Sequence, residues 1–257
     1  MNTNDVYITK CKVSNLELEE LLDAIHMYAR DDSSSEPAIM LSANIHGINQ
    51  AYKYQWLLRM NNNAELVRND SAGIQLAGKI LGIPIKERMT WADFGWDLAE
   101  YCEREGLTMY FLGNEEGIAQ KAKDELLKKY PALKIVGTYH GFFKKEGEEN
   151  QKVLEDINRL KPDILVVGFG MPLQERWILK NRSKLDVGII MTGGNCFNFL
   201  AGTESRAPEW MHKNGLEWLF RFLKEPVRMF DRYIIGNPVF LLRVFRQKLF
   251  KRSTSSS

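Results

Sequence analysis

The sequence predicts an α/β fold with a parallel sheet, because short apolar runs alternate with longer amphipathic patterns. Four apolar runs, 36–44, 107–114, 162–170 and 187–194, are each followed by residues with helical spacing or the start of a new element. Runs of this length that are apolar throughout are typical of parallel strands covered by helices. We therefore expect a Rossmann-like parallel sheet flanked by helices, with a helical, basic C-terminal appendage.

The expected helices follow the strands in order. Residues 46–60, 115–130 and 173–185 place apolar side chains three or four positions apart, and residues 195–202 begin a further element after the fourth run. Ligands of such sheets bind beyond the carboxyl ends of the strands. The residues at each strand end are therefore the first candidates for a site.

Small or polar residues occur at the ends of all four predicted strands. Glycines there let a ligand approach the backbone, and the N-termini of the following helices offer unpaired N–H groups to an anion. Such turns are often glycine-rich for structural reasons alone, but their repetition favours a nucleotide or phosphate crevice. The signatures GxGxxG and GxxxxGK[ST] are absent, so neither a dinucleotide site nor a Walker-type site is supported. The strand-end residues are Ser42, Asn44, Gly113, Asn114, Gly168, Gly170, Gly193 and Gly194.

Charge is distributed unevenly along the 257 residues. Residues 206–252 contain eleven Lys/Arg and four Asp/Glu, a net charge of +7, so the other residues carry −5 of the total of +2. This polarity predicts two parts. They are an α/β domain over 1–200 and a basic amphipathic appendage over 201–257.

Composition favours a cytoplasmic protein. Cys11, Cys102 and Cys196 form no CxxC pair, which fits a reducing compartment. The first residues lack an apolar run of signal-peptide length. No uncharged apolar run reaches the roughly 18 residues that a bilayer span needs. We expect a protein that is soluble or lies on a membrane surface.

Asp70 is the first candidate for a catalytic base. It stands in VRNDSAGIQLAGKILG, just before a run of helical periodicity. A carboxylate in that position can instead cap the helix by accepting backbone N–H bonds, and the residues alone favour the cap. Asp93 in MTWADFGWDLAEY has the same ambiguity, with Thr90 as a competing cap.

Metal signatures are missing from the sequence. The histidines, His26, His46, His140 and His212, are scattered without metal-ligand spacing, and there is no D-x-D motif of the kind that holds Mn²⁺ or Mg²⁺ in many nucleotide-sugar enzymes. We expect no metal and no cofactor. If a diphosphate leaves, Arg, Lys or helix N-termini must stabilise it. Gln174, just past a strand end, can reach the crevice or face solvent.

Six ordered stretches carry a family resemblance over roughly residues 38–235. They are DSAGIQLAGKILGIPIKERMTWAD, YFLGNEEG, IVGTYHGFF, PDILVVGFGMPLQERWI, GGNCFNFLAGTESRAPEWM and GLEWLFRFLKEPVRMFDRY. The chain resembles the WecG/TagA/CpsF family of bacterial glycosyltransferases. The resemblance implies an inverting, metal-independent transfer of a sugar from a UDP donor, N-acetylmannosamine or its uronic acid in the best-known members. The implied acceptor is undecaprenyl diphosphate bearing N-acetylglucosamine, in the synthesis of teichoic acid, enterobacterial common antigen or capsule.

The resemblance also implies roles for individual residues. Asp70 matches the family's proposed general base, which takes the proton from the acceptor hydroxyl, and this reverses the preference for a cap. Arg221 and Arg228 match arginines that complete the site over the diphosphate. A third arginine is expected where the chain has Asp231, with Arg232 beside it. The substrate-binding residues expected from strand ends and resemblance together are Ser42, Asn44, Gly113, Gln174, Gly193, Gly194, Asn198 and Arg232.

The C-terminal residues 215–252 are both apolar and basic. A polyprenyl-linked acceptor offers its sugar at the headgroup level, so an enzyme serving it needs an apolar face and cations. The alternative is a buried hairpin whose arginines pair with acidic neighbours. GLEWLFRFL leaves both interpretations open, whereas the five cations of VFLLRVFRQKLFKR have no acidic neighbour. We expect a peripheral enzyme on the inner face of the cell membrane. The interface side chains are Trp210, Trp218, Phe220, Phe222 and Tyr233, and the acidic partners of the alternative are Glu209, Glu217 and Glu225.

Other functions stay open at this point. A family member could use a different UDP-hexose, such as UDP-glucose, for capsule or exopolysaccharide. The family usually has Thr, a small residue and Asp at the positions of Ser42, Trp91 and Asn198, and these differences bear on donor choice. A non-enzymatic protein could bind membranes or polyanions with the basic tail, although charge confined to an apolar end fits lipid better than nucleic acid. A homo-oligomer would bury part of the same surface.

Overall fold

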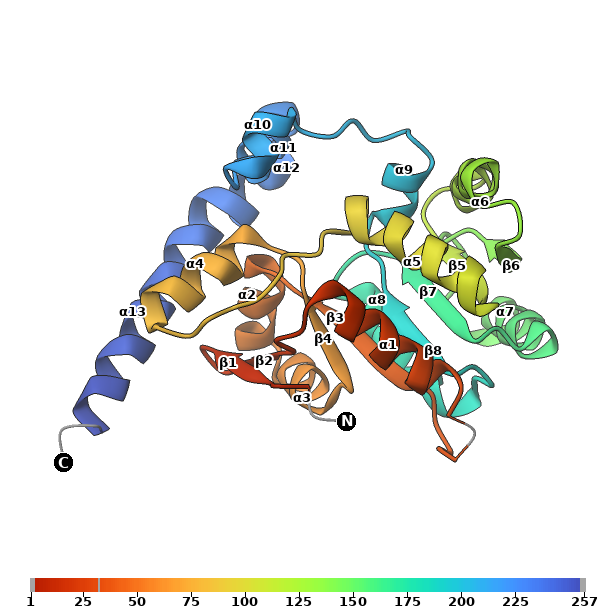
Figure 1. The fold of residues 1–257 in the computed structure, drawn as a ribbon, viewed down its shortest axis with the longest axis horizontal. Coiled ribbons are helices and arrows are strands. Elements are labelled where there is room, and N and C mark those ends of the chain that lie inside the picture. Colours follow the sequence, from red (N-terminus) through yellow and green to blue (C-terminus); the bar gives the residue numbers. More distant parts are fainter. Residues whose placement is uncertain (1–2, 32, 255–257) are drawn as a thin grey trace.

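A six-stranded parallel sheet forms the centre of the molecule (Figure 1). The structure, a computed structural model, describes residues 3–31 and 33–254. The strands are β3 (Ala38–Ala43), β4 (Leu66–Asn69), β5 (Thr108–Gly113), β6 (Lys134–Tyr139), β7 (Ile164–Gly168) and β8 (Ile189–Thr192). They lie in the order β4-β3-β8-β7-β5-β6. A small antiparallel pair, β1 (Val6–Ile8) and β2 (Cys11–Val13), precedes them. The predicted α/β class is confirmed.

Two strands of this sheet were not predicted. β4 consists of four residues, LVRN, all buried. β4 contains Arg and Asn, so it does not read as an apolar run in the sequence. These two side chains are buried only because of how the rest of the chain folds around them. β6, KIVGTY, is an edge strand with exposed ends, so its sequence needs fewer apolar residues. The other four strands lie within the predicted runs.

Helices cover both faces of the sheet. One face packs against α1 (Leu18–Ala29), α5 (Trp91–Glu105), α6 (Ile118–Lys129) and α9 (Cys196–Leu200). The other packs against α2 (Ile45–Lys53), α3 (Gln55–Asn63), α4 (Ala72–Leu81), α7 (Gly147–Leu160) and α8 (Leu173–Asn181), which a short 3-10 turn, η1 (Arg182–Lys184), follows. Successive strand residues point to opposite faces. In β3, for example, Met40 enters the first core and Ile39 and Leu41 the second.

The chain leaves neighbouring strands toward opposite faces. β3 and β7 continue into α2 and α8, whereas β8 and β5 continue into α9 and α6 on the other face. In parallel sheets this divergence makes room for a ligand beyond the carboxyl ends of the strands. Ser42, Gly113 and Gly193 lie at this carboxyl edge.

The C-terminal residues form the predicted helical appendage. An extended segment after α9 leads to α10 (Glu209–Lys213), α11 (Glu217–Lys224), α12 (Pro226–Met229), the π-helical η2 (Phe230–Ile235) and α13 (Gly236–Thr254). Figure 1 shows α13 beside α4 and α2, while α6 and α7 lie at the far side of the molecule. No helix in the described part of the chain is both long and apolar enough to cross a membrane. All three cysteines are buried and unpaired with one another.

α13 is joined to the α/β body by buried contacts. Phe240 and Val244 are both 0 % exposed and belong to the core beneath α2 and α4. The Asn49 Nδ2 donates to the Gly236 carbonyl at 2.8 Å, and the Gln247 Nε2 donates to the Tyr7 carbonyl at 3.0 Å. The division into parts 1–200 and 201–257 stays a prediction, and α13 shares a core with the first part.

Candidate active site

Asp70 lies at the carboxyl edge of the sheet, directly after β4. Its N–H donates to the Ala43 carbonyl at 2.9 Å, which fixes it beside the end of β3. The N-cap of α4 is Ser71, whose Oγ accepts from the Gly73 N–H at 3.1 Å. The capping interpretation of Asp70 is therefore wrong. Its carboxylate, 21 % exposed, is available for chemistry.

Arg68 is the main residue that the sequence analysis missed. This guanidinium is fully buried, with Nη1 3.6 Å from the Asp70 Oδ1. Its Nη2 donates to the Ser42 Oγ at 2.9 Å. The rings of Trp91 and Phe94 lie 5.0 and 4.5 Å from it. Arg68 thus links the ends of β3 and β4 under the Asp70 carboxylate, and the signal for it was a single Arg before the Asn-Asp pair in VRND.

Burial determines the basicity of Asp70. It raises the pKa of the Asp70 carboxyl, and the charge of Glu217 adds to this, while Arg68, Arg221 and Arg232 oppose it without cancelling it. A carboxylate with a raised pKa is a stronger base, which suits proton abstraction near neutral pH.

Two arginines of the C-terminal helices act on Asp70. They are Arg221 of α11, which lies 5.1 Å from the ring of Phe199, and Arg232 of η2. Arg228, expected in the same role, is 76 % exposed and pairs with the Glu225 Oε2 at 2.8 Å. The described structure therefore brings Arg221 and Arg232 toward Asp70 and leaves Arg228 on the surface. A π-helical turn holds an extra residue compared with an α-helix, and Arg232 lies in such a turn.

Tyr233 of η2 differs from expectation, and His46 of α2 lies near the site without having been predicted there. Tyr233, predicted to lie at a membrane interface, is buried and its ring packs 5.9 Å from that of Trp218, so that prediction is wrong. His46 of α2 was left unassigned. Burial, with a contribution from the charge of Arg232, lowers the pKa of His46 to about 4, so it is neutral at pH 7. A neutral imidazole can lie near Arg232 without repelling it.

Gln174 stabilises the glycine turn after β8 by a hydrogen bond. It is 4 % exposed, and its Oε1 accepts from the Gly194 N–H at 3.0 Å. Gly194 has a φ of +58°, which favours glycine. Gly193 forms the other half of this turn, its N–H donating to the Val167 carbonyl at 2.7 Å. The sequence allowed Gln174 either to reach the crevice or to face solvent. In the structure its side chain is buried and binds this turn.

Glu175 lies behind Gln174 and was also missed. Its Oε1 accepts from the Gln174 Nε2 at 2.8 Å, while its buried Oε2 has no hydrogen-bond partner. Burial raises the pKa of Glu175 to about 7. A cavity of about 20 Å³ lined by Glu175 and Ser42 is large enough for one water molecule. Glu175 thus supports the Gln174 amide from inside the core.

The other predicted residues have distinct local roles. Asn44 is the N-cap of α2, its Oδ1 accepting from the Gly47 N–H at 2.8 Å. A Cβ at Gly113 would lie 2.4 Å from the Gly168 carbonyl oxygen, so only glycine fits between β5 and β7. The Asn198 Oδ1 accepts from the Thr203 Oγ1 at 2.8 Å. Asn198 is therefore part of a polar patch at the start of the C-terminal segment.

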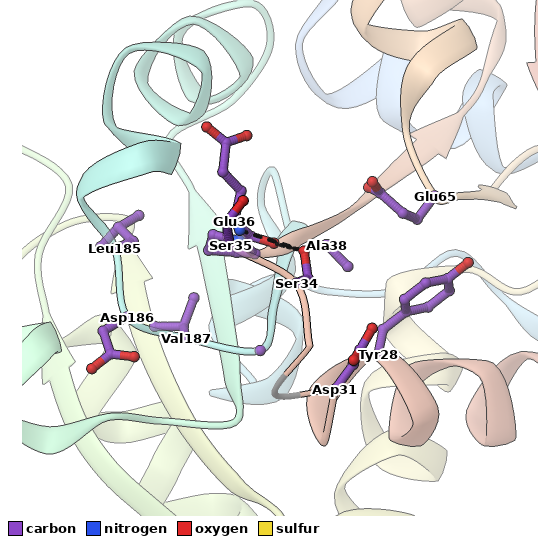
Figure 2. Close-up of a pocket in the computed structure, with 12 residues that line it drawn as sticks. Tyr28, Asp31, Ser34, Ser35, Glu36, Ala38, Glu65, Leu185, Asp186 and Val187 are labelled. Carbon is purple, nitrogen blue, oxygen red and sulfur yellow. Dashed lines mark hydrogen bonds between the residues drawn. The ribbon is translucent and has the colours of Figure 1, made fainter.

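A cavity of about 150 Å³ lies at the opposite edge of the sheet (Figure 2). It is lined by residues that precede β3, β4 and β8, such as Glu65 and Asp186, and by Tyr28 in the last turn of α1. None of the predicted site residues lines it. In the described residues, no group of three or more His, Cys, Asp or Glu side chains is arranged to hold a metal ion.

The fold and the site together define a class of protein. A parallel α/β sheet carries, at its carboxyl edge, a carboxylate of raised pKa with the buried Arg68 and two partly buried arginines around it. Such an arrangement can bind an anionic substrate, accept a proton and stabilise a leaving anion. These are the requirements of a group-transfer enzyme.

Comparison with known proteins gives this class a family. The sequence model of the "Glycosyl transferase WecG/TagA/CpsF family" matches residues 6–254. Curated relatives from Staphylococcus aureus strains MW2 and NCTC 8325 / PS 47 are each 25 % identical over 247 residues, which is 96 % of this chain and 94 % of the relative. Each is named N-acetylglucosaminyldiphosphoundecaprenol N-acetyl-beta-D-mannosaminyltransferase. The chain belongs to the WecG/TagA/CpsF family and is a glycosyltransferase, which confirms the resemblance and removes the non-enzymatic alternative.

Proposed function

We propose that this enzyme transfers N-acetylmannosamine from a UDP donor to the N-acetylglucosamine of an undecaprenyl-diphosphate-linked acceptor. Sugar and acceptor are those in the names of the S. aureus relatives. The observation that supports the proposal most is the Asp70 carboxylate at the carboxyl edge of β4, with the buried Arg68 beneath it and Arg221 and Arg232 acting on its charge.

In the proposed mechanism Asp70 is the general base. It removes the proton from the acceptor hydroxyl as that oxygen attacks the anomeric carbon. The new glycosidic bond forms on the face opposite the leaving UDP, and the old bond to the diphosphate oxygen breaks with its electron pair. One such displacement inverts the anomeric configuration. Arg68 holds the Asp70 carboxylate in place and Ser42 with it.

Stabilisation of the leaving diphosphate is assigned to arginines. Guanidinium groups present paired N–H donors that match phosphate oxygens and stay charged in a partly buried site. Arg221 and Arg232 are the cations of the C-terminal helices that act on Asp70. We propose that they carry the charge of the leaving group, so that transfer needs no metal ion.

The donor is proposed to lie along the glycine turn after β8, with Asn198 offering an amide to its nucleoside. A different UDP-hexose is the second candidate. This candidate was suggested by three differences from the family pattern, at Ser42, Trp91 and Asn198. Ser42 accepts a hydrogen bond from Arg68, and Trp91 is buried against the same arginine. Asn198 is therefore the substitution on which the alternative depends.

The C-terminal helices support attachment to an anionic membrane surface. Apolar side chains are unusually exposed there, Val227 at 92 %. Exposed apolar groups beside cations favour the lipid interface, where the headgroup of a polyprenyl-linked acceptor lies. Arg243 is not available for this, since it donates to Asn49 and lies 4.0 Å from the Tyr52 ring. The exposed side chains are Trp210, Leu223, Val227, Phe230, Ile234, Ile235, Leu242, Phe245, Leu249 and Phe250.

A product assay tests the proposal. The purified enzyme is given a panel of UDP-sugars and a short-chain analogue of the lipid-linked N-acetylglucosamine acceptor, and products are analysed by mass spectrometry and NMR. We expect addition of one N-acetylhexosamine, from UDP-N-acetylmannosamine alone, in a β linkage and at an unchanged rate in EDTA. Consumption of UDP-glucose instead would support the second candidate. Absence of transfer from every UDP-sugar would overturn both.

A further inference from the structure

A group of polar contacts joins the α/β body to the C-terminal helices beside the site. Asp93, in the first turn of α5, accepts from Arg206 and, at 3.1 Å, from the Thr90 Oγ1. The Arg88 Nη2 donates to the His212 carbonyl at 3.1 Å. Both arginines also approach the His212 Nε2, at 3.2 Å for Arg88 and 3.1 Å for Arg206. We refer to Arg88, Asp93, Arg206 and His212 as the latch.

Glu217 connects the latch to the active site. Its Oε2 lies 3.5 Å from the His212 Nδ1, a contact that is not a hydrogen bond, and its Oε1 accepts from the Arg221 Nη2 at 3.3 Å. The His212 and Glu217 side chains are 19 % and 15 % exposed, so water screens these contacts only partly. Arg221 acts in turn on the charge of Asp70. One carboxylate thus lies between the latch and the guanidinium that serves the site.

The backbone at this point is also close to the site. Gly215, between α10 and α11, has a φ of +71°, and a Cβ there would lie 3.0 Å from the Ala72 Cβ. Ala72 begins α4, two residues after Asp70. A shift of α10 or α11 would therefore move Arg221 relative to Asp70, and misplacement by about 1 Å is enough to lower a rate about 100-fold.

We propose that Glu217 is a positioning residue: held by the latch, it fixes the Arg221 guanidinium where the leaving diphosphate must be stabilised. This inference rests on the proposed transfer reaction. In this role Glu217 orients a group that acts on the substrate, whereas an ordinary surface ion pair would contribute only to stability. Removal of its charge should reduce kcat more than it weakens donor binding, because Arg221 would remain present but poorly oriented.

A second consequence concerns the pH profile. The groups whose charges act on Asp70 are Arg68 of β4, Arg221 and Glu217 of α11, and Arg232 of η2, and Glu217 is the one among them that raises the pKa of Asp70. Without that negative charge the pKa of Asp70 falls. The acid limb of the rate profile, where the base becomes protonated, must then move to lower pH.

Glu217→Gln tests this inference with little change in shape. We expect kcat to fall about 10- to 100-fold, the KM for the UDP donor to change less than about threefold, and the acid limb to move to lower pH. Glu209→Gln is the matched control, because Glu209 pairs with Lys213 on α10 at 2.7 Å with both side chains at least 70 % exposed. A purely structural role would lower thermal stability without moving the acid limb. Wild-type kcat and an unmoved acid limb in Glu217→Gln would overturn the inference.

Hydrogen exchange separates this inference from the proposed function. Arg206→Gln removes a half-exposed member of the latch, and the readout needs no sugar transfer. We expect amides of α11 to exchange roughly tenfold faster while those of α4 and α9 keep their rates. Unchanged exchange in α11 would contradict the latch. A wild-type enzyme without transfer activity would contradict the proposed function and leave this measurement valid.

Discussion

The two sides of the candidate active site are built differently. On the body side, Asp70 rests on the fully buried Arg68, and Glu175 supports Gln174 from the core. On the C-terminal side, α11 and α12 have no buried residue and α10 has only Met211. Their arginines are held by ion pairs, which are weaker than core packing and are screened by salt. The proposed base is thus fixed by the fold, whereas Arg221, one of the two proposed charge-stabilising groups, depends on its ion pair with Glu217.

The largest effect is expected on the body side. Asp70→Asn removes the proton acceptor and keeps the shape of the side chain. We expect kcat to fall at least about 100-fold, in the usual range for a general base, with UDP affinity retained in a calorimetric titration. Unchanged turnover would exclude Asp70 from this role.

The second prediction places α13 with the body. Phe240→Ala should lower the free energy of unfolding by about 3–5 kcal/mol, because the side chain is 0 % exposed in the core. Phe245→Ala, on the same helix but 50 % exposed, should change it by less than about 0.5 kcal/mol. Denaturant unfolding measures both. Equal effects would show that α13 is not docked as described.

Truncation extends this comparison. The sequence predicts that removal of residues after about 205 leaves a folded core without transfer activity. Because Phe240 and Val244 are buried against α2 and α4, we expect the truncated protein to be less stable as well. Removal of α13 would expose the apolar surface of these two helices to water. A truncated protein with full activity on a lipid-linked acceptor would contradict both expectations.

The third prediction concerns the support behind Gln174. The folded protein holds a proton on Glu175 up to about pH 7, whereas the ordinary pKa is 4.5. The unfolded chain binds fewer protons in that window, so stability falls as pH rises from 4.5 to 7 and stays reduced above it. The shift corresponds to about 3 kcal/mol. Glu175→Gln should remove this loss, so its melting temperature relative to wild type should be higher at pH 8 than at pH 5.

The smallest effect tests the C-terminal side. Arg232→Gln should lower kcat about tenfold, since Arg221 still serves the same diphosphate; tenfold corresponds to about 1.4 kcal/mol. Arg228→Gln should leave kcat within about twofold of wild type, because Arg228 is 76 % exposed and pairs with Glu225. Steady-state kinetics with the short-chain acceptor compares them. A larger loss in Arg228→Gln would restore the role that the sequence predicted for it.

The sequence predicted the fold class and the position of Asp70 at the carboxyl edge of the sheet, because apolar runs and motif order are local properties. It missed Arg68 and Glu175, whose importance comes from burial that several distant elements create together. It assigned both Arg228 and Arg232 to the site, and Arg228 lies on the surface, since the side of a helix that a residue occupies changes at a π-helical turn. It left Gln174 undecided, because only the folded chain brings Gly194 within hydrogen-bond distance of it.

The two faces of α13 have a geometric consequence for the proposed work at a membrane. Phe240 and Val244 are buried and attach one face of α13 to the body. Leu242 and Phe245, on another face of the helix, are exposed to solvent. A bilayer that receives the outward face would set the tilt of the entire molecule, because this helix cannot rotate on its own. The distance of Asp70 from the lipid surface would then be fixed. The enzyme would accept only those acceptors whose reactive sugar lies at that same distance from the headgroups.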